Sequence, residues 1–582
     1  MSFPEDFLHI CQDDFSGILR GKTLCHPSGT TINDCKTGWI PSNALITFFG
    51  ALTPLPDAEI GDLHFVPALE QPYSVKSKDG LINSRLLFGK FLNLDGSPWN
   101  FCTRSILEGA LNQLRSNYEL ELEIGIELEF YLLDNSRNHL NAYSLESFIE
   151  EETLLAEYAE LLISSGVGLK SIHSENGTSQ YELTINRTSP MEAADQLVLS
   201  KAIGQLLATK RKRHLSFSPI VDQAKVGSGL HIHFSLRKLN GQPCNLDSKG
   251  KVSELSGAFL NGLLVHLGGL LAFTSPSVIS PMRYRPPRWT AYYNNFAIAD
   301  RKAAIRLTEM GEGNQATHFE LRTADASANA YLMLAGMIQA GILGLEKNLS
   351  EVSIVPTSSI QKNNHPNIHR LPETLEDCLQ QLEHDLEFIK KFDSHFTKDD
   401  IPQNGILGSE VILQVKCIGE KRIDSFDVCG VDNFNHIPSI SSFPTQYTYP
   451  NPSLDSTWTG MLAIQAMMNR YLSDPDIPPT IASDLAFGIS ALMKVFFYFE
   501  GINVEWNSQE FGFACFFGVY ASMHQSVVSS IDDHVSFSDG KSLLSKAKAT
   551  NSYGFYVAWL VNMWNLHLPE GMYTHHQQGP LS

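Results

Sequence analysis

The stretch Gly125-Ile126-Glu127-Leu128-Glu129-Phe130 most constrains what this chain can fold into. Acids that alternate with apolar residues predict a β-strand, because strand side chains repeat every second residue. Glu127 and Glu129 therefore share one face of that strand. Two carboxylates held side by side repel each other unless a cation or a proton lies between them, and this run contains no basic residue. A divalent metal site is one interpretation, and a solvated face of an edge strand is the other.

Two further groups of polar residues follow in the sequence. Glu175 and Glu182 flank an Asn-Gly pair, which is a strong turn signal, so the chain can fold back and bring both acids near one point. His231 and His233 alternate with apolar residues after a glycine-rich turn, which places both histidines on one face of a predicted strand. Such a pair is either a polar surface or a pair of metal ligands, and the second reading requires that acids converge on it.

A last group combines an acid with arginines. His318, Glu320 and Arg322 alternate with apolar residues and share a face. An arginine-dense stretch precedes them, with Arg283, Arg285, Arg288, Arg301 and Arg306. Arginine keeps its charge and binds carboxylate or phosphate with two hydrogen bonds, so arginines beside an acid cluster indicate an anionic substrate bound together with a cation. A solvated basic face is the alternative. Glutamates with few histidines suit magnesium or manganese and nucleotide phosphates better than zinc.

Composition narrows the class of protein. The chain carries 43 Lys and Arg against 63 Asp and Glu, a formal charge of −20, which opposes unassisted binding to nucleic acid or to an anionic membrane. Its nine cysteines include no C-x-x-C pair, so the sequence predicts neither a zinc site nor a disulfide framework. No signal peptide opens the chain and no apolar run has the length of a membrane span. We expect a cytoplasmic protein that acts on small molecules.

The organisation of the chain predicts an α+β protein of three parts. The length of 582 residues is too great for one ordinary core. Residues 1–103 contain short predicted strands and turns, including 15–22, 44–50 and 62–66, and we expect a small β-rich domain there. Residues 104–440 hold all the polar groups described above and form the expected catalytic domain. Helical patterns after a loop rich in Pro, Ser and Asn predict a mainly α-helical C-terminal extension at 441–582, whose role the sequence does not indicate.

Six motifs in order resemble the glutamine synthetases, in their bacterial type I form. They are DFSGILRGK, GIELEF, HSENGTSQYE, GSGLHIHFSL, RKAAIR and FELRTADASANAYL, and the resemblance runs from about residue 13 to about residue 430. It implies a small N-terminal β-grasp domain and a catalytic domain whose antiparallel strands form a funnel with helices outside. It also implies a ring-shaped homo-oligomer with active sites between neighbouring subunits.

The resemblance also implies roles for individual residues. Glu129, Glu175 and Glu182 match the ligands of the metal that organises glutamate, and Glu127, His231 and Glu320 match the ligands of the metal that bridges the ATP phosphates. Catalytic roles fall to Arg283, Arg322 and Glu320, and nucleotide contacts to His233, Ser235, Arg301 and Arg306. The cofactors implied are two or more Mg²⁺ or Mn²⁺ ions per active site, with ATP as co-substrate. The reaction implied transfers the γ-phosphate of ATP to the γ-carboxylate of glutamate, and an amine then attacks the acyl phosphate.

The chain departs from the family pattern at several positions. His318 stands where the family has another basic residue, and Val226 replaces the asparagine before the glycine turn. The lysine expected after the helix that ends near residue 213 is missing from 217–220. No tyrosine for adenylylation is found at 366–369, so that form of regulation is not expected.

The acceptor side of the site departs furthest. In ammonia-using members, an aspartate of the N-terminal domain and a glutamate on a flap form the negative pocket for ammonium. Their places in this chain fall in Thr47-Phe48-Phe49-Gly50 and near Trp289. Aromatic rings bind a larger amine through burial of its carbon skeleton and cation–π contact. We therefore expect an organic amine rather than ammonia, with Asp57 as the residue that would restore an ammonium pocket.

Three functions stay open. The first is a γ-glutamyl ligase that uses an organic amine, the second is glutamine synthetase proper with ammonia, and the third is a structural or regulatory descendant without turnover. A phosphagen-kinase-like activity on a similar scaffold is a further, weaker alternative. Retention of all six metal-ligand positions argues against the descendant, since a protein that only binds has no physical need to keep mutually repelling carboxylates.

Overall fold

The structure is a computed structural model. It describes residues 7–25, 31–44, 61–133, 141–222, 225–285, 290–308, 317–360, 362 and 365–392. These all belong to one compact unit of the chain, which comprises residues 1–423 and 448–451. The predicted helical extension at 441–582 lies outside the described residues.

The N-terminal part forms a six-stranded sheet in the order β2-β1-β6-β4-β3, with β5 paired to β6. Its strands are β1 (Phe7–Asp13), β2 (Leu19–Cys25), β3 (Thr37–Trp39), β4 (Leu63–Pro67), β5 (Tyr73–Lys76) and β6 (Asn83–Leu92). The pair β1–β6 is parallel and the others are antiparallel. Phe65 and Phe91 pack in its core with ring centroids 4.5 Å apart. The sheet agrees with the expected β-rich region, while its assignment as a β-grasp domain stays a prediction.

One expected strand, 15–22, is a turn followed by a strand. The Asp14 carboxylate accepts hydrogen bonds from the backbone N–H groups of Ser16 and Ile18, at 2.9 Å each. Gly17 has a φ of 74°, a left-handed conformation that glycine adopts at little cost. Because this local turn holds residues 14–18, β2 begins only at Leu19.

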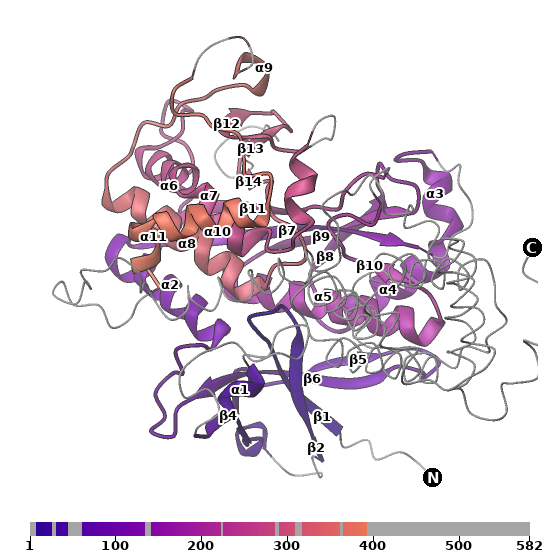
Figure 1. The fold of residues 1–582 in the computed structure, drawn as a ribbon. Helices are drawn as coiled ribbons and strands as arrows, with labels where there is room; N and C mark the ends of the chain where they lie inside the picture. Colours follow the sequence, from indigo (N-terminus) through magenta and orange to yellow (C-terminus); the bar gives the residue numbers. More distant parts are fainter. Residues whose placement is uncertain are drawn as a thin grey trace, which may run out of the picture. The chain divides into compact units, whose positions relative to one another are not determined.

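The second sheet has eight strands in the order β12-β13-β14-β11-β7-β9-β8, with β10 paired to β7. Its strands are β7 (Leu120–Leu132), β8 (Leu169–Ser174), β9 (Gln180–Thr188), β10 (Leu215–Ser216), β11 (Leu230–Lys238), β12 (Tyr293–Ile298), β13 (Ala303–Leu307) and β14 (Phe319–Leu321). All pairs are antiparallel except β12–β13. Figure 1 shows β7, β9 and β8 side by side, with β11 and β14 beyond β7.

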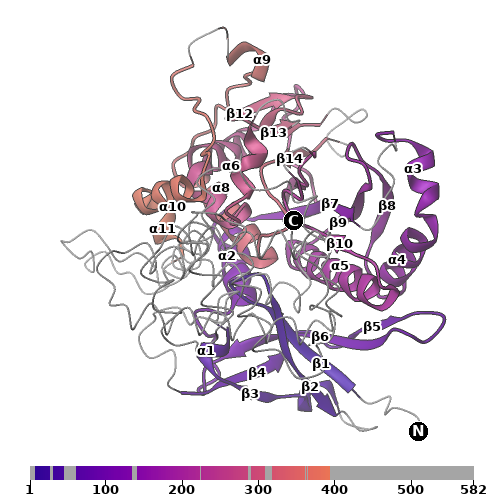
Figure 2. The ribbon, with the colours of Figure 1, turned by 45° about the vertical axis from the view of Figure 1, so that its right-hand side comes forward.

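Helices pack around this sheet. The α-helices are α1 (Pro41–Ala44), α2 (Thr103–Tyr118), α3 (Leu145–Glu150), α4 (Glu152–Ser164), α5 (Pro190–Arg211), α6 (Glu254–Val265), α7 (Leu267–Thr274), α8 (Ala330–Glu346), α9 (Thr357–Ile360), α10 (Leu375–His384) and α11 (Leu386–Lys390). Two short 3-10 helices lie at Ile32–Asp34 and Ser280–Tyr284. Helix α5 packs on β7 and β9, as Figure 2 shows. Sheet and helices together are consistent with the predicted α+β class.

Sequence signals explain where the long helix α5 starts and stops. The Ser189 hydroxyl accepts a hydrogen bond from the Glu192 N–H, and Pro190 occupies the first turn, where its missing N–H costs nothing. Lys212 ends the helix in a left-handed conformation. The mostly apolar α8 is buried along most of its length and forms the centre of the helical layer. Since α5 and α8 are rigid and packed, they hold the sheet that carries the predicted site.

Buried polar contacts join the N-terminal sheet to the helices. The Asn329 side chain, at the start of α8, donates to the backbone carbonyls of Asp13 and Asp14, at 3.1 Å and 2.7 Å. Arg104 of α2 forms an ion pair with Asp195 of α5, and the Tyr331 hydroxyl of α8 donates to Asp195 at 2.6 Å. These contacts fix α2, α5 and α8 to one another.

A search of the described helices for membrane spans finds no single helix of sufficient length and apolarity. One pair, α6 and α7, passes the test together, but by length and composition only and with a bend of 77° between its members.

Candidate active site

The register of the second sheet brings the predicted ligands together. Cross-strand partners point to the same face of a sheet, so a pair in register is also a pair of neighbouring side chains. Three such pairs consist of predicted site residues: Glu129 with Glu182, Glu127 with His231, and His233 with Glu320. Four strands, β9, β7, β11 and β14, therefore supply one continuous polar surface.

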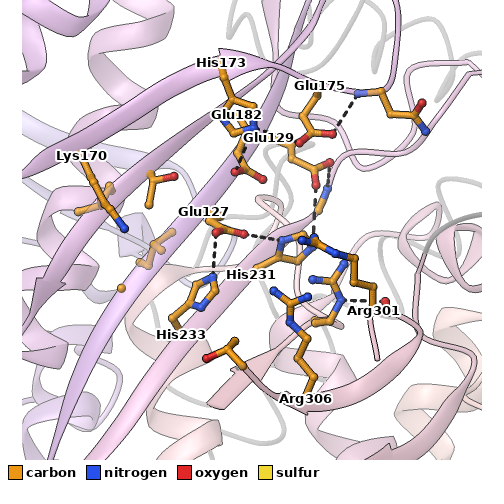
Figure 3. Close-up of a pocket in the computed structure, with 18 of the residues that line it drawn as sticks. Glu127, Glu129, Lys170, His173, Glu175, Glu182, His231, His233, Arg301 and Arg306 are labelled. Atoms are coloured by element: carbon orange, nitrogen blue, oxygen red, sulfur yellow. Dashed lines mark hydrogen bonds and ion pairs between the residues drawn. The ribbon is translucent and has the colours of Figure 1, made fainter. Parts of the chain in front are cut away.

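This surface forms the wall of a cavity of about 750 Å³. Ten of the predicted site residues line it: Glu127, Glu129, Glu175, Glu182, His231, His233, Arg283, Arg301, Arg306 and Arg322. Figure 3 shows acids along one side and arginines along the other. Two predicted residues lie behind this lining. Glu320 is fully buried, and Ser235 is buried with its hydroxyl accepting from the Asn245 amide at 3.1 Å.

Two histidines hold Glu127. The Nδ1 atom of His231 lies 3.1 Å from one carboxylate oxygen, and the Nε2 atom of His233 lies 3.0 Å from the other. Burial alone would raise the pKa of Glu127, but hydrogen bonds to His231 and His233 outweigh it and lower that pKa. Glu127 is therefore a carboxylate. His233 also contacts His318 through its other nitrogen, at 2.9 Å, so the replacement at position 318 gives a chain of two imidazoles leading to Glu127.

Glu129 is held by N–H donors. Its Oε2 atom accepts from the Gly229 backbone N–H at 2.8 Å and from the Gln180 side-chain amide at 3.1 Å. Its Oε1 atom lies 3.8 Å from the Nε2 atom of His231. Burial raises the pKa of Glu129, and the nearby Glu175 carboxylate raises it further. One oxygen is thus saturated by donors, and the other faces the cavity.

Glu182 has the least favourable environment of the acids. It is 6% exposed. Burial raises its pKa well above the usual range, and four other carboxylates raise it further: Glu127, Glu129, Glu175 and Glu320. Among the described residues, two imidazoles lie near this carboxylate: the Nε2 atom of His173 is 3.7 Å away, and a ring nitrogen of His231 lies within 4.8 Å. A cation or a proton is therefore required beside Glu182, as the acid pairs in the sequence predicted.

Glu175 lies at the turn between β8 and β9. Its carboxylate accepts from the Asn176 N–H at 3.0 Å and lies 3.4 Å from the Nε2 atom of His173. Burial would raise the pKa of Glu175, but the hydrogen bonds to His173, Asn176 and the Tyr143 hydroxyl lower it. The contact with Glu175 in turn raises the pKa of His173.

Glu320 is neutralised by arginines. Arg306 and Arg322 both form very short ion pairs with its carboxylate. Burial would raise the pKa of Glu320, but Arg322 and its other cationic neighbours lower it. His231 lies 3.7 Å from the same carboxylate, which links this pair of arginines to the Glu127 end of the cavity.

Arg283 is anchored by backbone carbonyls. One guanidinium nitrogen donates to the Ala324 carbonyl at 2.9 Å, and the side chain is 4% exposed. Arg301, in contrast, has an exposed surface, and its backbone carbonyl accepts from Arg322 at 3.0 Å. A fixed buried arginine and a more exposed one therefore face the same cavity, and both can receive an anion.

Sequence reasoning missed several lining residues: Tyr143, Lys170, His173, Arg187 and Asn186. Strand alternation could have found His173, which pairs directly with Glu182 across β8 and β9. No periodic signal marks Tyr143, which has a φ of 57° outside any strand. Trp289 and residues 47–50, where the acceptor side was expected, lie outside the described residues.

The donor atoms fit divalent cations that prefer oxygen. Three groups of described residues have ligand atoms within 4.8 Å of one another: Glu127, Glu182 and His231; Glu127, His233 and Glu320; His173, Glu175 and Glu182. Each consists of two carboxylates and one imidazole. Such a donor set suits Mg²⁺ or Mn²⁺, which agrees with the ions expected from the sequence.

The fold is consistent with a glutamine synthetase-type catalytic domain. The family model described as "Glutamine synthetase, catalytic domain" matches residues 100–399, more than half of the chain. The chain belongs to the glutamine synthetase family, as the six motifs indicated.

Individual relatives agree with this assignment. The chain is 27% identical over 321 residues to type-1 glutamine synthetase 1 of Dictyostelium discoideum, a match that covers 51% of this chain and 64% of that protein. It is 26% identical over 353 residues to the gamma-glutamylpolyamine synthetase GlnA3 of Streptomyces coelicolor, covering 57% of this chain and 73% of that protein. A crystal structure described as a novel glutamine synthase homolog matches with a TM-score of 0.62 and 25% identity, over 73% of this chain and 95% of the other. The structure of GmaS without ligand matches at 19% identity with a TM-score of 0.61, which supports the fold alone.

Proposed function

We propose that this protein is an ATP-dependent carboxylate–amine ligase that forms a γ-glutamyl amide from glutamate and an organic amine. The observation that carries the proposal is the cavity in which five buried or half-buried glutamates meet four arginines: Glu127, Glu129, Glu175, Glu182 and Glu320 with Arg283, Arg301, Arg306 and Arg322. Acids in such number favour bound cations, and the arginines beside them favour an anionic ligand that can share their guanidinium groups with the acids. A metal–nucleotide complex together with an amino-acid carboxylate satisfies both preferences.

The ligand sets follow from the resemblance. The register supports one pair in each set, Glu129 with Glu182 and Glu127 with His231, whereas Glu320 pairs with His233. We assign Glu129, Glu175 and Glu182 to the cation beside glutamate, and Glu127, His231 and Glu320 to the cation on the ATP phosphates. Bound cations would neutralise these acids and withdraw charge from the phosphate that is transferred. Use of Glu320 as a ligand requires that it share its carboxylate with Arg306 and Arg322.

The arginines are assigned to the anionic groups. Arg283, held by the Ala324 carbonyl, is suited to the glutamate carboxylate because its position is fixed before binding. Arg322 is suited to the phosphoryl group in transfer, and Arg301 and Arg306 to the nucleotide phosphates. The γ-carboxylate of glutamate attacks the γ-phosphorus of ATP and releases ADP; the amine nitrogen then attacks the acyl carbon (Cδ) of the γ-glutamyl phosphate, releases phosphate and loses a proton.

The choice of an organic amine is supported by the aromatic residues at the expected acceptor positions and by one relative. Phe48, Phe49 and Trp289 stand where ammonia-using members have acids. A polyamine or another amine with a carbon skeleton can bury that skeleton against aromatic rings, whereas ammonium cannot. The relative named gamma-glutamylpolyamine synthetase points to the same class of acceptor. Tyr143, which lines the cavity beside Glu175, adds an aromatic ring to the cavity itself.

Competition between acceptors tests the proposal. Purified protein receives glutamate, ATP, Mg²⁺ and equal concentrations of ammonium and a panel of mono-, di- and polyamines, and mass spectrometry identifies the amide. We expect a γ-glutamyl amide of one amine to dominate. Glutamine as the main product would establish ordinary glutamine synthetase activity instead. Absence of ATP turnover with every acceptor would favour a structural or regulatory descendant, and phosphorylation of the amine without amide formation would favour the phosphagen-kinase-like alternative.

The remaining expectations concern the setting of the reaction. We propose small-molecule substrates, a cytoplasmic location, no nucleic acid or membrane partner, and a ring-shaped homo-oligomer with active sites between subunits. Sedimentation or mass photometry of the full chain decides the last of these.

A further inference from the structure

Gln180 contacts two members of one proposed ligand set and lies on the same strand as the third. It is the first residue of β9 and is 1% exposed. Its side-chain amide donates to Oε2 of Glu129 at 3.1 Å, and its backbone carbonyl accepts from the Glu175 N–H at 2.8 Å. Glu182 follows two residues later on the same strand and faces the same side of the sheet. A single buried residue thus connects the three acids that belong to two strands and a turn.

The same amide also holds the loop that precedes β11. The nitrogen of Gln180 lies 3.1 Å from the Gly227 carbonyl and 3.3 Å from the Ser228 hydroxyl. Its oxygen accepts from the Gly177 N–H at 2.9 Å, which closes the turn after Glu175. The nitrogen and the oxygen of this side chain therefore both have partners, which belong to β7, to the loop at 227–228 and to the turn at Gly177.

These contacts determine which oxygen of Glu129 is available. Gln180 and the Gly229 N–H both donate to Oε2, which leaves Oε1 as the oxygen that faces the cavity. A carboxylate held in this way offers one directed oxygen to a cation, and it does not lose side-chain freedom when the cation binds. The side-chain amide of Gln180 also fixes the orientation of the Gly227 carbonyl, and Gly227 lines the cavity.

We propose that Gln180 is a positioning residue that fixes Glu129 for the cation and the Gly227 carbonyl for the amino-acid substrate. This inference rests on the proposed function for the substrate, while its consequence for cation binding can be measured without any substrate. The role of Gln180 is indirect, since Gln180 acts through Glu129 and the 227–229 loop.

The test measures Mn²⁺ binding to the full-length protein by electron paramagnetic resonance, after removal of metals by chelation. Gln180→Met removes the donors and the acceptor and leaves size and charge nearly unchanged. Loss of a hydrogen-bond partner behind a metal ligand typically weakens metal affinity by about 10-fold to 100-fold. We expect one class of Mn²⁺ site to weaken by that factor and the class that depends on Glu127 and His231 to keep its affinity.

A matched control separates positioning from general stability. Gln12 of β1 is also a buried glutamine, and its amide donates to the Thr103 hydroxyl at 3.1 Å, away from the residues that line the cavity. Gln12→Met should lower the melting temperature without weakening either class of Mn²⁺ site. If Gln12→Met and Gln180→Met weaken all sites alike, or if Gln180→Met leaves both classes intact, the inference is wrong.

Two more variants cover the other outcomes. Glu129→Gln keeps the acceptor for the Gly229 N–H but removes the charge, so it reports on the ligand assignment itself. Unchanged Mn²⁺ binding in Glu129→Gln would overturn that assignment. Loss of Mn²⁺ binding in Glu129→Gln but not in Gln180→Met would overturn only the role of Gln180. Gln180→Glu keeps the shape and replaces donors by a charge facing Glu129, so it serves where Gln180→Met is not folded. In either Gln180 variant, KM for glutamate should rise while KM for ATP stays within about 2-fold of the wild type. A rise in both KM values would contradict the proposed position.

Discussion

Replacing Glu182 by glutamine should make the metal-free protein more stable, and the gain should grow with pH. The usual pKa of a glutamate is 4.5, and burial together with four surrounding carboxylates raises the pKa of Glu182 well above that value. Between these two values the folded protein keeps a proton that the unfolded chain releases. The folded state then binds more protons than the unfolded state, so its stability falls as pH rises. Below pH 4.5 both states are protonated, and this contribution to the pH dependence vanishes.

The magnitude follows from the linkage between protons and folding. One proton of difference changes the free energy of unfolding by about 1.4 kcal/mol per pH unit. From pH 5 to pH 8 the wild type should therefore lose up to about 4 kcal/mol relative to Glu182→Gln, because the variant has no titrating group at this position. The neutral amide also lacks the repulsion from Glu127 and Glu129.

The assay is unfolding in urea at pH 5, 6, 7 and 8 with a chelator present, followed by tryptophan fluorescence. Glu123→Gln serves as the matched control. Glu123 lies on the same face of β7 as Glu127 and Glu129, but its carboxylate faces Arg237, 2.7 Å away, and not other acids. Its curves should follow those of the wild type at each pH. Saturating Mg²⁺ should raise the stability of the wild type more than that of Glu182→Gln, because the cation binds the folded state through this carboxylate. Parallel pH profiles for the wild type and Glu182→Gln would refute the reasoning.

Three further predictions concern other parts of the chain. Arg283→Lys should raise KM for glutamate by about 10-fold or more, because lysine cannot both contact the Ala324 carbonyl and bind a carboxylate with two hydrogen bonds. Steady-state kinetics at saturating ATP would show this rise, and an unchanged KM would contradict the prediction. Asp195→Ala should lower the free energy of unfolding by about 3–5 kcal/mol, since it leaves Arg104 as a buried charge without its carboxylate partner. Calorimetry measures this loss, and a loss below about 1 kcal/mol would show that the ion pair is not needed for stability. Deletion of residues 441–582 should cause aggregation or a smaller assembly, because the sequence there predicts helices with long apolar stripes; light scattering decides, and a soluble product of unchanged size would mark the segment as an independent appendage.

Strand periodicity predicted the faces of the site correctly. The alternation around Glu127 and Glu129 lies within β7, and that around His231 and His233 lies within β11. In each case one apolar residue separates two polar ones, and the polar pair lines the cavity. Periodicity works here because a strand has only two faces and the apolar one must be buried.

The neighbours of each strand could not be predicted from its own residues. Sequence order gives β7, β9, β11 and β14, whereas the sheet order is β14-β11-β7-β9. This order depends on packing against α5 and on long connections, which the residues of a single strand do not encode. Gln180 was missed for a related reason, because a glutamine after an Asn-Gly turn is ordinary in sequence, and its partners Glu129, Gly227 and Ser228 come from distant segments.

The five glutamates of the cavity are kept in place by different means, and this determines how cations can enter. Glu127 is balanced by His231 and His233, and Glu320 by two arginines, so both are already ionised. Glu129 is oriented by N–H donors, while burial and four neighbouring carboxylates raise the pKa of Glu182 well above its usual range, so that it keeps a proton where the other acids are ionised.

A cation at the Glu182 end must therefore displace a proton, whereas a cation at the Glu127 end must share ligands with imidazoles and guanidinium groups. The two ends of one cavity are thus unequal before any ligand arrives. Affinity at the Glu182 end should depend on pH because proton release accompanies binding there. At the Glu127 end, the positive groups lower the affinity for a bare cation and raise it for a cation that arrives with phosphate, because phosphate can replace the carboxylate as the partner of the arginines.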